Sequence, residues 1–263
     1  MKRLIYQVCL GNQGQSKLYK KCIESVSYYA QNHDIVHYTQ QIPKMRIKPD
    51  PFTSNRSTES WQKHGGFLPI YEKENAFDLL DEYDQIAIVD ADIYIRPDAP
   101  NIFDEMSDDN AFGCVFEREM TITDKYKQKI RNYSQMQYGQ LHSNKTDFKP
   151  NGLGFEFANM GMIVLNCKKF KPYLQGQTAK EFISRMEFKD FVDGMGAWKW
   201  STDQTLLNFF LKKYDVPTQH LSHTWNGLYG VNTEIEKCHF VHFFLKDLLP
   251  EQGENVEELM KKI

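Results

Sequence analysis

The sequence predicts an α/β protein in which a mixed β-sheet is flanked by helices. The chain opens with a strand, a helix and a second strand, an order typical of doubly wound sheets. Residues 86–89 form a continuous apolar run, as expected for a strand that is covered on both faces. With 263 residues, of which 41% are hydrophobic, the chain is long enough to bury a large core. We therefore expect a single globular domain over residues 1–263.

The first elements place a turn at the edge of the expected sheet. Residues 4–10 predict a strand, and a helix with an apolar stripe runs from its N-cap Ser16 to a stop at about residue 32. Residues 35–38 predict the second strand. Ligands of such sheets bind beyond the carboxyl ends of the strands, so Gly11 and Asn12, which follow the first strand, lie at a candidate binding rim.

The next elements lead into the apolar run and beyond it. Residues 40–66 lack periodicity and contain several prolines, which predicts a long loop. Pro69 opens a helix that reaches about residue 82 and leads into a strand over 86–95. The elements expected after it are a short helix at 98–106, a strand at 112–116 and a helix at about 124–141.

The second half of the chain contains two predicted helix starts and two strands. Thr178 and Glu181 form a capping-box pattern, and Ser201 is expected to cap a later helix. That second helix would hold Asp203 and Gln204 in its first turn, at the positive end of the helix dipole. The remaining elements are strands at 155–166 and 239–245 and a polar helix around 254–262.

Charge and cysteine content exclude several classes of function. The formal net charge is −3, and no run of Lys and Arg exceeds two residues, so a nucleic-acid partner is not expected. The N-terminal segment is too short and too polar for a signal peptide, and no stretch approaches the length of a membrane span. We expect a cytoplasmic protein. The five cysteines lie far apart without a CxxC pair and predict reduced core thiols.

Two carboxylates, Asp90 and Asp92, interrupt the end of the apolar strand. Residues two apart on an extended chain point the same way, so the two side chains can converge on one point while Ala91 faces elsewhere. Acids next to so apolar a run cost free energy unless something compensates their charge. A divalent cation would do so, and the alternative is that the two acids only end the strand and cap the next segment.

Four motifs occur in an order that resembles the glycosyltransferases with the GT-A fold. They are the D-x-D at 90–92, an N-x-G followed by apolar residues from 159, a D-Q-x-x-L-N at 203–208 and an H-F at 242–243. The chain is similar to the glycogenin-like and bacterial galactosyltransferase group, and the resemblance spans roughly residues 4–246. It implies a GT-A type, Rossmann-like sheet with a nucleotide-binding half over about 1–120 and an acceptor half over about 121–263.

The resemblance implies that His242 is a third metal ligand beside Asp90 and Asp92. Two carboxylates and one imidazole suit Mn²⁺, with Mg²⁺ as the other candidate. Such an ion can stabilise the diphosphate that leaves a nucleotide-sugar donor. After this histidine the chain departs from the family pattern. It reads Phe-Phe-Leu-Lys, where members of the family often have a glycine and then K-P-W.

The resemblance also implies roles at the donor sugar. Asn159 and Gly161 match residues that contact the donor, and Asp203 and Gln204 match a pair at the sugar's reacting face. The structural alternatives are a strand-entry turn for the first pair and helix capping for the second. The D-Q motif favours a retaining reaction, in which the leaving phosphate accepts the acceptor proton.

Further candidates complete the expected site. Gly11, Asn12, Lys73 and Ala91 are candidate contacts to a UDP- or GDP-sugar. Lys73 can equally be a solvated helix charge.

Trp225 and Asn226, in a turn before the last strand, are candidate contacts to a carbohydrate or glycoconjugate acceptor, and packing is the alternative role of the tryptophan. Two other readings of the chain stay open. One is an inverting transferase with Asp193 or Glu156 as general base, and the other is an inactive module that binds nucleotide sugars.

Overall fold

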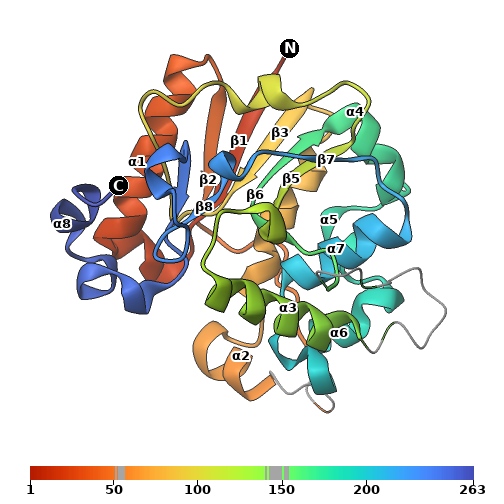
Figure 1. Cartoon of the computed structure of the whole chain (residues 1–263). Helices are drawn as coiled ribbons and strands as arrows, with labels where there is room; N and C mark the ends of the chain where they lie inside the picture. The colour runs from red at the N-terminus through yellow and green to blue at the C-terminus, as the bar shows by residue number, and fades with distance from the viewer. Residues whose placement is uncertain (51, 53–56, 140, 142–149, 151–153) are drawn as a thin grey trace.

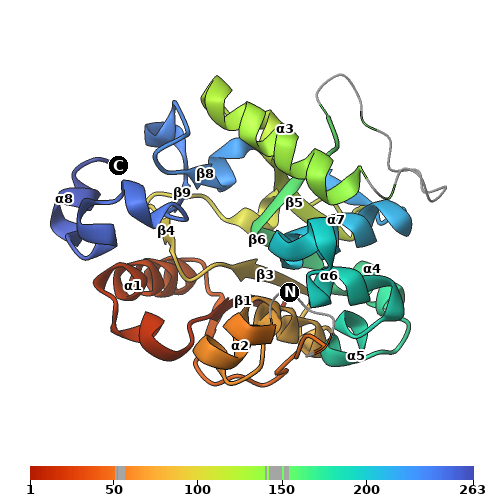
Figure 2. The same cartoon turned by 90° about the horizontal axis from the view of Figure 1, so that it is seen from below.

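A computed structural model of the chain describes residues 1–50, 52, 57–139, 141, 150 and 154–263. A six-stranded mixed sheet with the order β2-β1-β3-β6-β5-β7 forms its centre, and a small sheet with the order β4-β9-β8 lies beside it. In Figures 1 and 2, α1 and α8 lie on one side of the molecule, and α4, α5, α6 and α7 lie on the other. The architecture confirms the predicted α/β class with a mixed sheet.

The strands follow the chain order closely. Those of the main sheet are β1 (Arg3–Val8), β2 (Val36–Gln40), β3 (Gln85–Val89), β5 (Phe112–Phe116), β6 (Ala158–Asn166) and β7 (Thr218–His220). Those of the small sheet are β4 (Ile93–Ile95), β8 (Gly227–Leu228) and β9 (Phe240–His242).

The helices vary widely in length. The α-helices are α1 (Lys17–Asn32), α2 (Ser57–His64), α3 (Asp124–Tyr138), α4 (Cys167–Phe170), α5 (Ala179–Ile183), α6 (Lys189–Asp193), α7 (Asp203–Lys213) and α8 (Val256–Met260). Two 3₁₀ helices border the site described below, η1 (Gly11–Gln15) and η2 (Pro69–Leu79).

The middle of the main sheet is buried on both faces. Every residue of β3 and of β5 is buried, as are all residues of β6 except its last. Strand β3 runs parallel to β1 and antiparallel to β6, and β5 is also antiparallel to β6. The carboxyl ends of β3 and β5 therefore face the same edge of the sheet.

The C-terminal part of the chain forms a second, smaller core beside α1. Leu18 and Cys22 of α1 pack with Val241 and Phe243 around β9 and with Leu259 of α8. Figures 1 and 2 both show α8 next to α1 and close to the small sheet. This packing holds β9 in place, and β9 carries one of the site residues.

Several predicted elements differ in detail from the structure. The segment expected as a loop over 40–66 contains the helix α2, which has no apolar repeat that would reveal it. The helix after Pro69 is 3₁₀ and ends at Leu79. The N-cap of α7 is Thr202, not Ser201, because the Ser201 hydroxyl donates to the carbonyl of Phe191 instead.

The strand expected over 86–95 is in fact two strands, which belong to different sheets. Strand β3 ends at Val89 and β4 starts at Ile93. Between them the chain turns, with the amide of Ile93 donating to the carbonyl of Asp90 at 3.1 Å. The convergence of Asp90 and Asp92 thus arises from a turn and not from strand alternation.

A buried carboxylate fixes the segment that follows β2. Glu72 of η2 accepts hydrogen bonds from the backbone amides of Lys44, Met45 and Arg46 at 2.8 to 3.1 Å and from the Gln40 side chain at 2.8 Å. Burial alone would raise the pKa of Glu72, but these donors outweigh it and lower the pKa. The segment is therefore tied to the helix that leads into the site.

Two global expectations can be compared with the structure. All five cysteines are free and buried, as predicted.

In the part of the chain that the structure describes, no helix combines the length and the apolar character needed to cross a membrane.

Candidate active site

Asp90 and Asp92 lie in the turn at the carboxyl end of β3. The amide of Asp90 donates to the carbonyl of Gly161 at 2.7 Å, and this bond continues the pairing of β3 with β6 past the end of the strand. The amide of Phe243 donates to the carbonyl of Asp92 at 3.0 Å. The main chain on both sides of Ala91 is thus fixed by strands from later parts of the chain.

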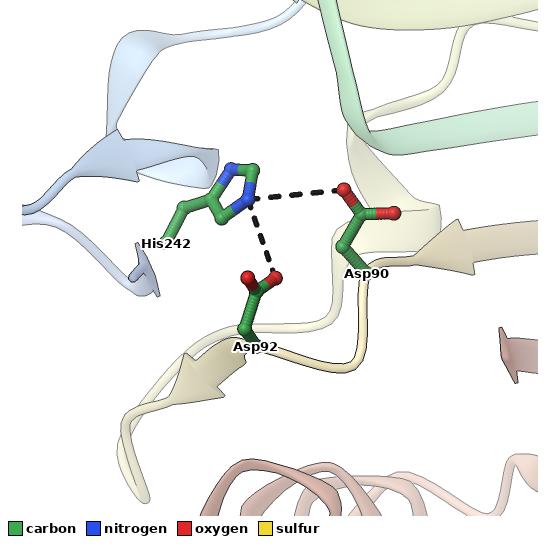
Figure 3. Close-up of side chains that lie close together, drawn as sticks. All are labelled: Asp90, Asp92 and His242. Carbon is green, nitrogen blue, oxygen red and sulfur yellow. Dashed lines mark ion pairs between the residues drawn. The ribbon is translucent and has the colours of Figure 1, made fainter. Parts of the chain in front are cut away.

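Strand pairing in the small sheet brings His242 to the two aspartates. Strand β4 pairs antiparallel with β9, and Ile93 lies opposite His242. The His242 Nε2 atom lies 3.4 Å from Asp92 Oδ1 and 3.7 Å from Asp90 Oδ2 (Figure 3). One ligand atom from each of the three side chains lies within 4.8 Å of the other two.

Each aspartate uses one oxygen for a lysine and turns the other toward His242. Asp90 Oδ1 accepts from Lys73 Nζ at 2.8 Å, and Asp92 Oδ2 accepts from Lys246 Nζ at 2.5 Å. The oxygens that face His242 are the other two, Asp90 Oδ2 and Asp92 Oδ1. Two carboxylate oxygens and one imidazole nitrogen therefore converge on a common point.

The surroundings of Asp92 favour its charged form. Burial raises the pKa of the Asp92 carboxyl, but His242 and Lys246 outweigh this effect and hold the pKa well below its usual range. The side chain is therefore a carboxylate at neutral pH. A charged oxygen is the form in which an aspartate binds a metal ion.

The donor set fits a small divalent cation. Oxygen and imidazole ligands suit Mn²⁺ and Mg²⁺. Ligand atoms about 2.1 Å from one octahedral ion lie about 3 Å apart when they occupy adjacent positions, so the spacings around His242 Nε2 need only a small contraction. Asp90, Asp92 and His242 could thus hold such an ion.

Gly161 makes room for the His242 ring. A Cβ atom at position 161 would lie 2.4 Å from His242 Cε1, 2.7 Å from its Nδ1 and 3.0 Å from Asn159 Oδ1. These distances are shorter than van der Waals contacts. The glycine is therefore required by the close approach of β6 to β9.

We expect Gly161→Ala to weaken divalent-cation binding at least about 10-fold, because the added methyl group displaces the His242 ring. Calorimetric titration with Mn²⁺ measures this effect. Gly14→Ala is the matched control, since a Cβ at that exposed glycine meets no atom within 4 Å. Equal Mn²⁺ affinity in the two variants would show that the ring position does not matter for the ion.

A buried carboxylate, Glu117, joins two of the predicted site residues. Glu117 Oε1 accepts from Asn159 Nδ2 at 2.8 Å and from Gln204 Nε2 at 2.9 Å. Burial raises the pKa of Glu117, although both amides partly offset this effect. Glu117 follows β5 directly, as Asp90 follows β3, so the parallel course of the two strands brings both acids to one edge of the sheet.

Lys73 joins the metal-ligand side of the site to the start of α7. Its Nζ lies 2.8 Å from Asp90 Oδ1 and 2.9 Å from Asp203 Oδ2, and it donates to the carbonyl of Met160 at 2.7 Å. Burial lowers the pKa of Lys73, but the two carboxylates outweigh this effect and raise it. The lysine is thus a largely buried cation paired with two carboxylates, and not a solvated helix charge.

A cavity opens next to the two aspartates. It is lined by Val8, Leu10, Gln13, Tyr19, Pro69, Ile70, Lys73, Asp90, Ala91, Asp92 and Asp203. Of the predicted donor contacts, Lys73 and Ala91 lie in its wall. Gly11 and Asn12 are exposed and do not line it, and their neighbours Leu10 and Gln13 do so instead.

The predicted acceptor residues lie inside the protein. Trp225 is buried and packs against the rings of His239 and Phe240. Asn226 is also buried and makes hydrogen bonds to Asn159 and to His242. Neither side chain offers a surface to a sugar in this structure, because both serve in packing and internal hydrogen bonding.

The two candidate general bases lie away from the aspartates. Glu156 is exposed, forms an ion pair with Lys212 at 3.8 Å and lines a different pocket. Asp193 is buried, accepts from the amide of Asp50 at 2.8 Å and pairs with Lys189. Neither residue lines the cavity that contains Asp90 and Asp92.

Sequence reasoning missed three residues at or beside the site. Glu117 had a usable signal, because it directly follows an apolar strand, which is the pattern that singled out Asp90. Tyr19 and Gln13 line the cavity but had no signal, since one lies in an amphipathic helix and the other in a turn.

The comparisons with known proteins find likeness in structure and none in sequence. No protein-family profile and no curated protein matches the chain. An active-site mutant of LgtC, a galactosyltransferase, matches with a TM-score of 0.50 at 15% identity over 98% of this chain and 95% of that chain.

Two further solved structures match less well. For mouse xyloside xylosyltransferase 1 the TM-score is 0.48 at 12% identity, over 95% of this chain and 100% of that chain. For core-mannan synthase A of Aspergillus fumigatus the TM-score is 0.44 at 10% identity, over 83% of this chain and 72% of that chain. The likeness to LgtC extends over nearly the whole of both chains, and it shows that this chain has the GT-A fold of glycosyltransferases.

Proposed function

We propose that the chain is a glycosyltransferase that moves a sugar from a nucleotide-sugar donor to an acceptor hydroxyl. The observation that carries this proposal is the convergence of Asp90, Asp92 and His242, with one ligand atom of each within 4.8 Å of the others, beside a cavity in a GT-A fold. The donor half of the proposed site comes from residues up to about 120, and later segments complete it.

Asp90, Asp92 and His242 would hold a divalent cation, with Mn²⁺ or Mg²⁺ as candidates. Bound there, the ion would supply charge stabilisation to the diphosphate of a UDP- or GDP-sugar. Lys246 already touches Asp92 and lies close to the ring of Tyr19 in the cavity wall. Its positive charge is therefore available to a phosphate oxygen that enters from the cavity.

Gln204 and Asp203 would face the donor sugar, whereas the amide of Asn159 is bonded to Glu117, Gly161 and Asn226 inside the protein. Glu117 accepts from the side-chain nitrogen of Gln204, and among the described residues none is a hydrogen-bond partner of Gln204 Oε1. An amide oxygen near the anomeric carbon can stabilise positive charge that develops there. Asp203, paired with Lys73, would orient a sugar hydroxyl.

Retention of configuration is the proposed stereochemical outcome. An inverting reaction needs a general base for the acceptor hydroxyl, and Glu156 and Asp193 both lie outside the cavity. In the retaining route the leaving phosphate accepts the proton, so no such base is required. The acceptor would be a carbohydrate or glycoconjugate.

Hydrolysis of a panel of nucleotide sugars with and without Mn²⁺ or Mg²⁺ tests the proposal. We expect slow, metal-dependent release of the nucleoside diphosphate from one donor, because water replaces the missing acceptor. NMR of the released sugar reports its anomeric configuration, and the retained anomer is expected. Metal-dependent donor binding without turnover would indicate a nucleotide-sugar binding module, and no binding at all would refute both functions.

A further inference from the structure

A chain of buried hydrogen bonds connects the main chain of β6 to the ring of His242. The backbone amide of Gly161 donates to Asn159 Oδ1 at 2.9 Å, and Asn226 Nδ2 lies 2.8 Å from the same oxygen. Asn226 Oδ1 in turn lies 3.1 Å from His242 Nδ1. The exposed fractions of Asn159, Asn226 and His242 are 6%, 0% and 5%, so water does not compete for these groups.

The direction of every bond in this chain follows from one fixed donor. A backbone N–H can only donate, so the atom of Asn159 that faces Gly161 must be its oxygen. The Asn226 atom that faces this oxygen must then be the nitrogen, because two amide oxygens repel each other. Asn226 therefore presents its oxygen to His242, and an oxygen without hydrogen can only accept.

It follows that the His242 Nδ1 atom carries a proton. In a neutral imidazole only one nitrogen is protonated, so Nε2 keeps its lone pair. Nε2 is the atom that faces Asp90 Oδ2 and Asp92 Oδ1. When the ring is neutral, its free lone pair therefore points to the place where the two carboxylates converge.

The contact of Asn159 with Glu117, at the other end of this row of hydrogen bonds, supports the same donor and acceptor assignment. Asn159 Nδ2 donates to Glu117 Oε1 at 2.8 Å, which is the orientation that the Gly161 amide requires. The opposite orientation would set N–H against N–H at Gly161 and oxygen against oxygen at Glu117. Two independent contacts of Asn159 therefore agree.

We propose that Asn159 and Asn226 are positioning residues that fix His242 as the Nδ1–H tautomer and aim its Nε2 lone pair between Asp90 and Asp92. The use of this lone pair to bind a divalent cation rests on the proposed function above. The hydrogen-bonded partners of a metal-binding histidine commonly select its tautomer in this way. Asn226 is buried and offers no surface to an acceptor sugar, so its role is to position His242.

The tautomer can be measured without metal or nucleotide. Long-range ¹H–¹⁵N spectra of the metal-free protein, at a pH at which the ring is neutral, distinguish a protonated ring nitrogen from one with a lone pair. His242→Ala identifies the signals of this ring among those of the eight histidines. We expect Nδ1 to be the protonated nitrogen, and protonation at Nε2 would overturn the proposal.

Two variants of Asn226 test whether the asparagine sets this state. Asn226→Asp keeps an oxygen that accepts from Nδ1–H but loses the donor to Asn159 Oδ1, so in a folded variant the Nδ1–H tautomer should persist. Asn226→Ala removes the acceptor, so the tautomer preference should be lost and Mn²⁺ affinity should fall about 10- to 100-fold. Retention of the Nδ1–H tautomer in Asn226→Ala would contradict the proposal, as would its loss in a folded Asn226→Asp.

The outcomes separate this inference from the proposed function. If the wild-type ring is the Nδ1–H tautomer but the protein binds no Mn²⁺, the positioning role stands and the metal site fails. If Mn²⁺ binds while the neutral ring is protonated at Nε2, the metal site stands and the positioning role fails. Where a variant of Asn226 does not fold, the wild-type spectrum alone decides.

Discussion

Asp92→Asn is expected to abolish metal-dependent donor binding while the fold stays intact. The change removes one charged ligand, and loss of even a partner of a ligand lowers metal affinity about 10- to 100-fold, so we expect a decrease of more than about 100-fold. The Asp92 carbonyl still accepts from Phe243, and the main chain keeps its bonds. Because the Asp92 carboxylate also pairs with Lys246, the variant should lose some stability, and urea-induced unfolding checks that it is folded under the conditions of the titration.

Asp104→Asn is the matched control for this experiment. Asp104 makes an ion pair with Arg3 at 2.8 Å and its side chain is 66% exposed, so the same charge is removed outside the site. Calorimetric titration of both variants with Mn²⁺, and then with a donor, separates a local effect from one of net charge. Full donor affinity in Asp92→Asn would remove the metal role from that residue.

Lys73→Met is expected to lower the free energy of unfolding by about 3–5 kcal/mol, the usual cost of removing one partner of a buried ion pair. The Lys73 side chain is 13% exposed and its Nζ lies within 2.9 Å of oxygens of Asp90 and Asp203. Burial and Asp203 raise the pKa of Glu74, a buried acid next in sequence, and Lys73 partly offsets this effect. Urea-induced unfolding measures the loss.

The pH dependence of the Lys73→Met variant has a definite sign. Burial raises the pKa of Asp203, and Lys73 partly offsets this effect, so loss of the lysine raises the pKa further. A carboxyl group whose pKa is higher in the folded than in the unfolded state binds its proton more tightly when folded. The stability lost by the variant should therefore be regained as the pH falls through the pKa of Asp203.

Two further variants check the explanation. Lys171→Met removes a lysine that is 50% exposed and paired with Asp81, and it should cost only about 0–1 kcal/mol. The double variant Lys73→Met/Asp203→Asn also removes the Asp203 carboxylate that has lost its lysine partner. It should therefore recover a large part of the lost stability. A loss below about 1 kcal/mol in Lys73→Met would show that the lysine does not compensate the buried acids.

The sequence predicted those features that depend on neighbouring residues. The apolar run at 86–89 identified β3, and the two acids after it indicated where the candidate site lies. The capping box of Thr178 and Glu181 is present at the start of α5. Local patterns of this kind need no knowledge of distant segments.

Features that depend on distant pairing could not be predicted. The meeting of Asp92 with His242 was implied by the family resemblance alone, because it depends on the register of β4 with β9, across about 150 residues, and these strands have only three residues each. The turn at Ala91, which separates β3 from β4, has no glycine or proline to signal it. The hydrogen bonds of Asn226 also depend on this register, so its buried position could not be recognised from the sequence.

A crystal structure of the protein with Mn²⁺ and a nucleoside diphosphate tests the central claim most directly. Anomalous scattering locates the ion without assumptions about its ligands. We predict a peak about 2.0–2.3 Å from Asp90, Asp92 and His242 Nε2, with a phosphate oxygen of the nucleotide on its open side. A peak at another place, or a nucleotide bound without contact to this ion, would contradict the account.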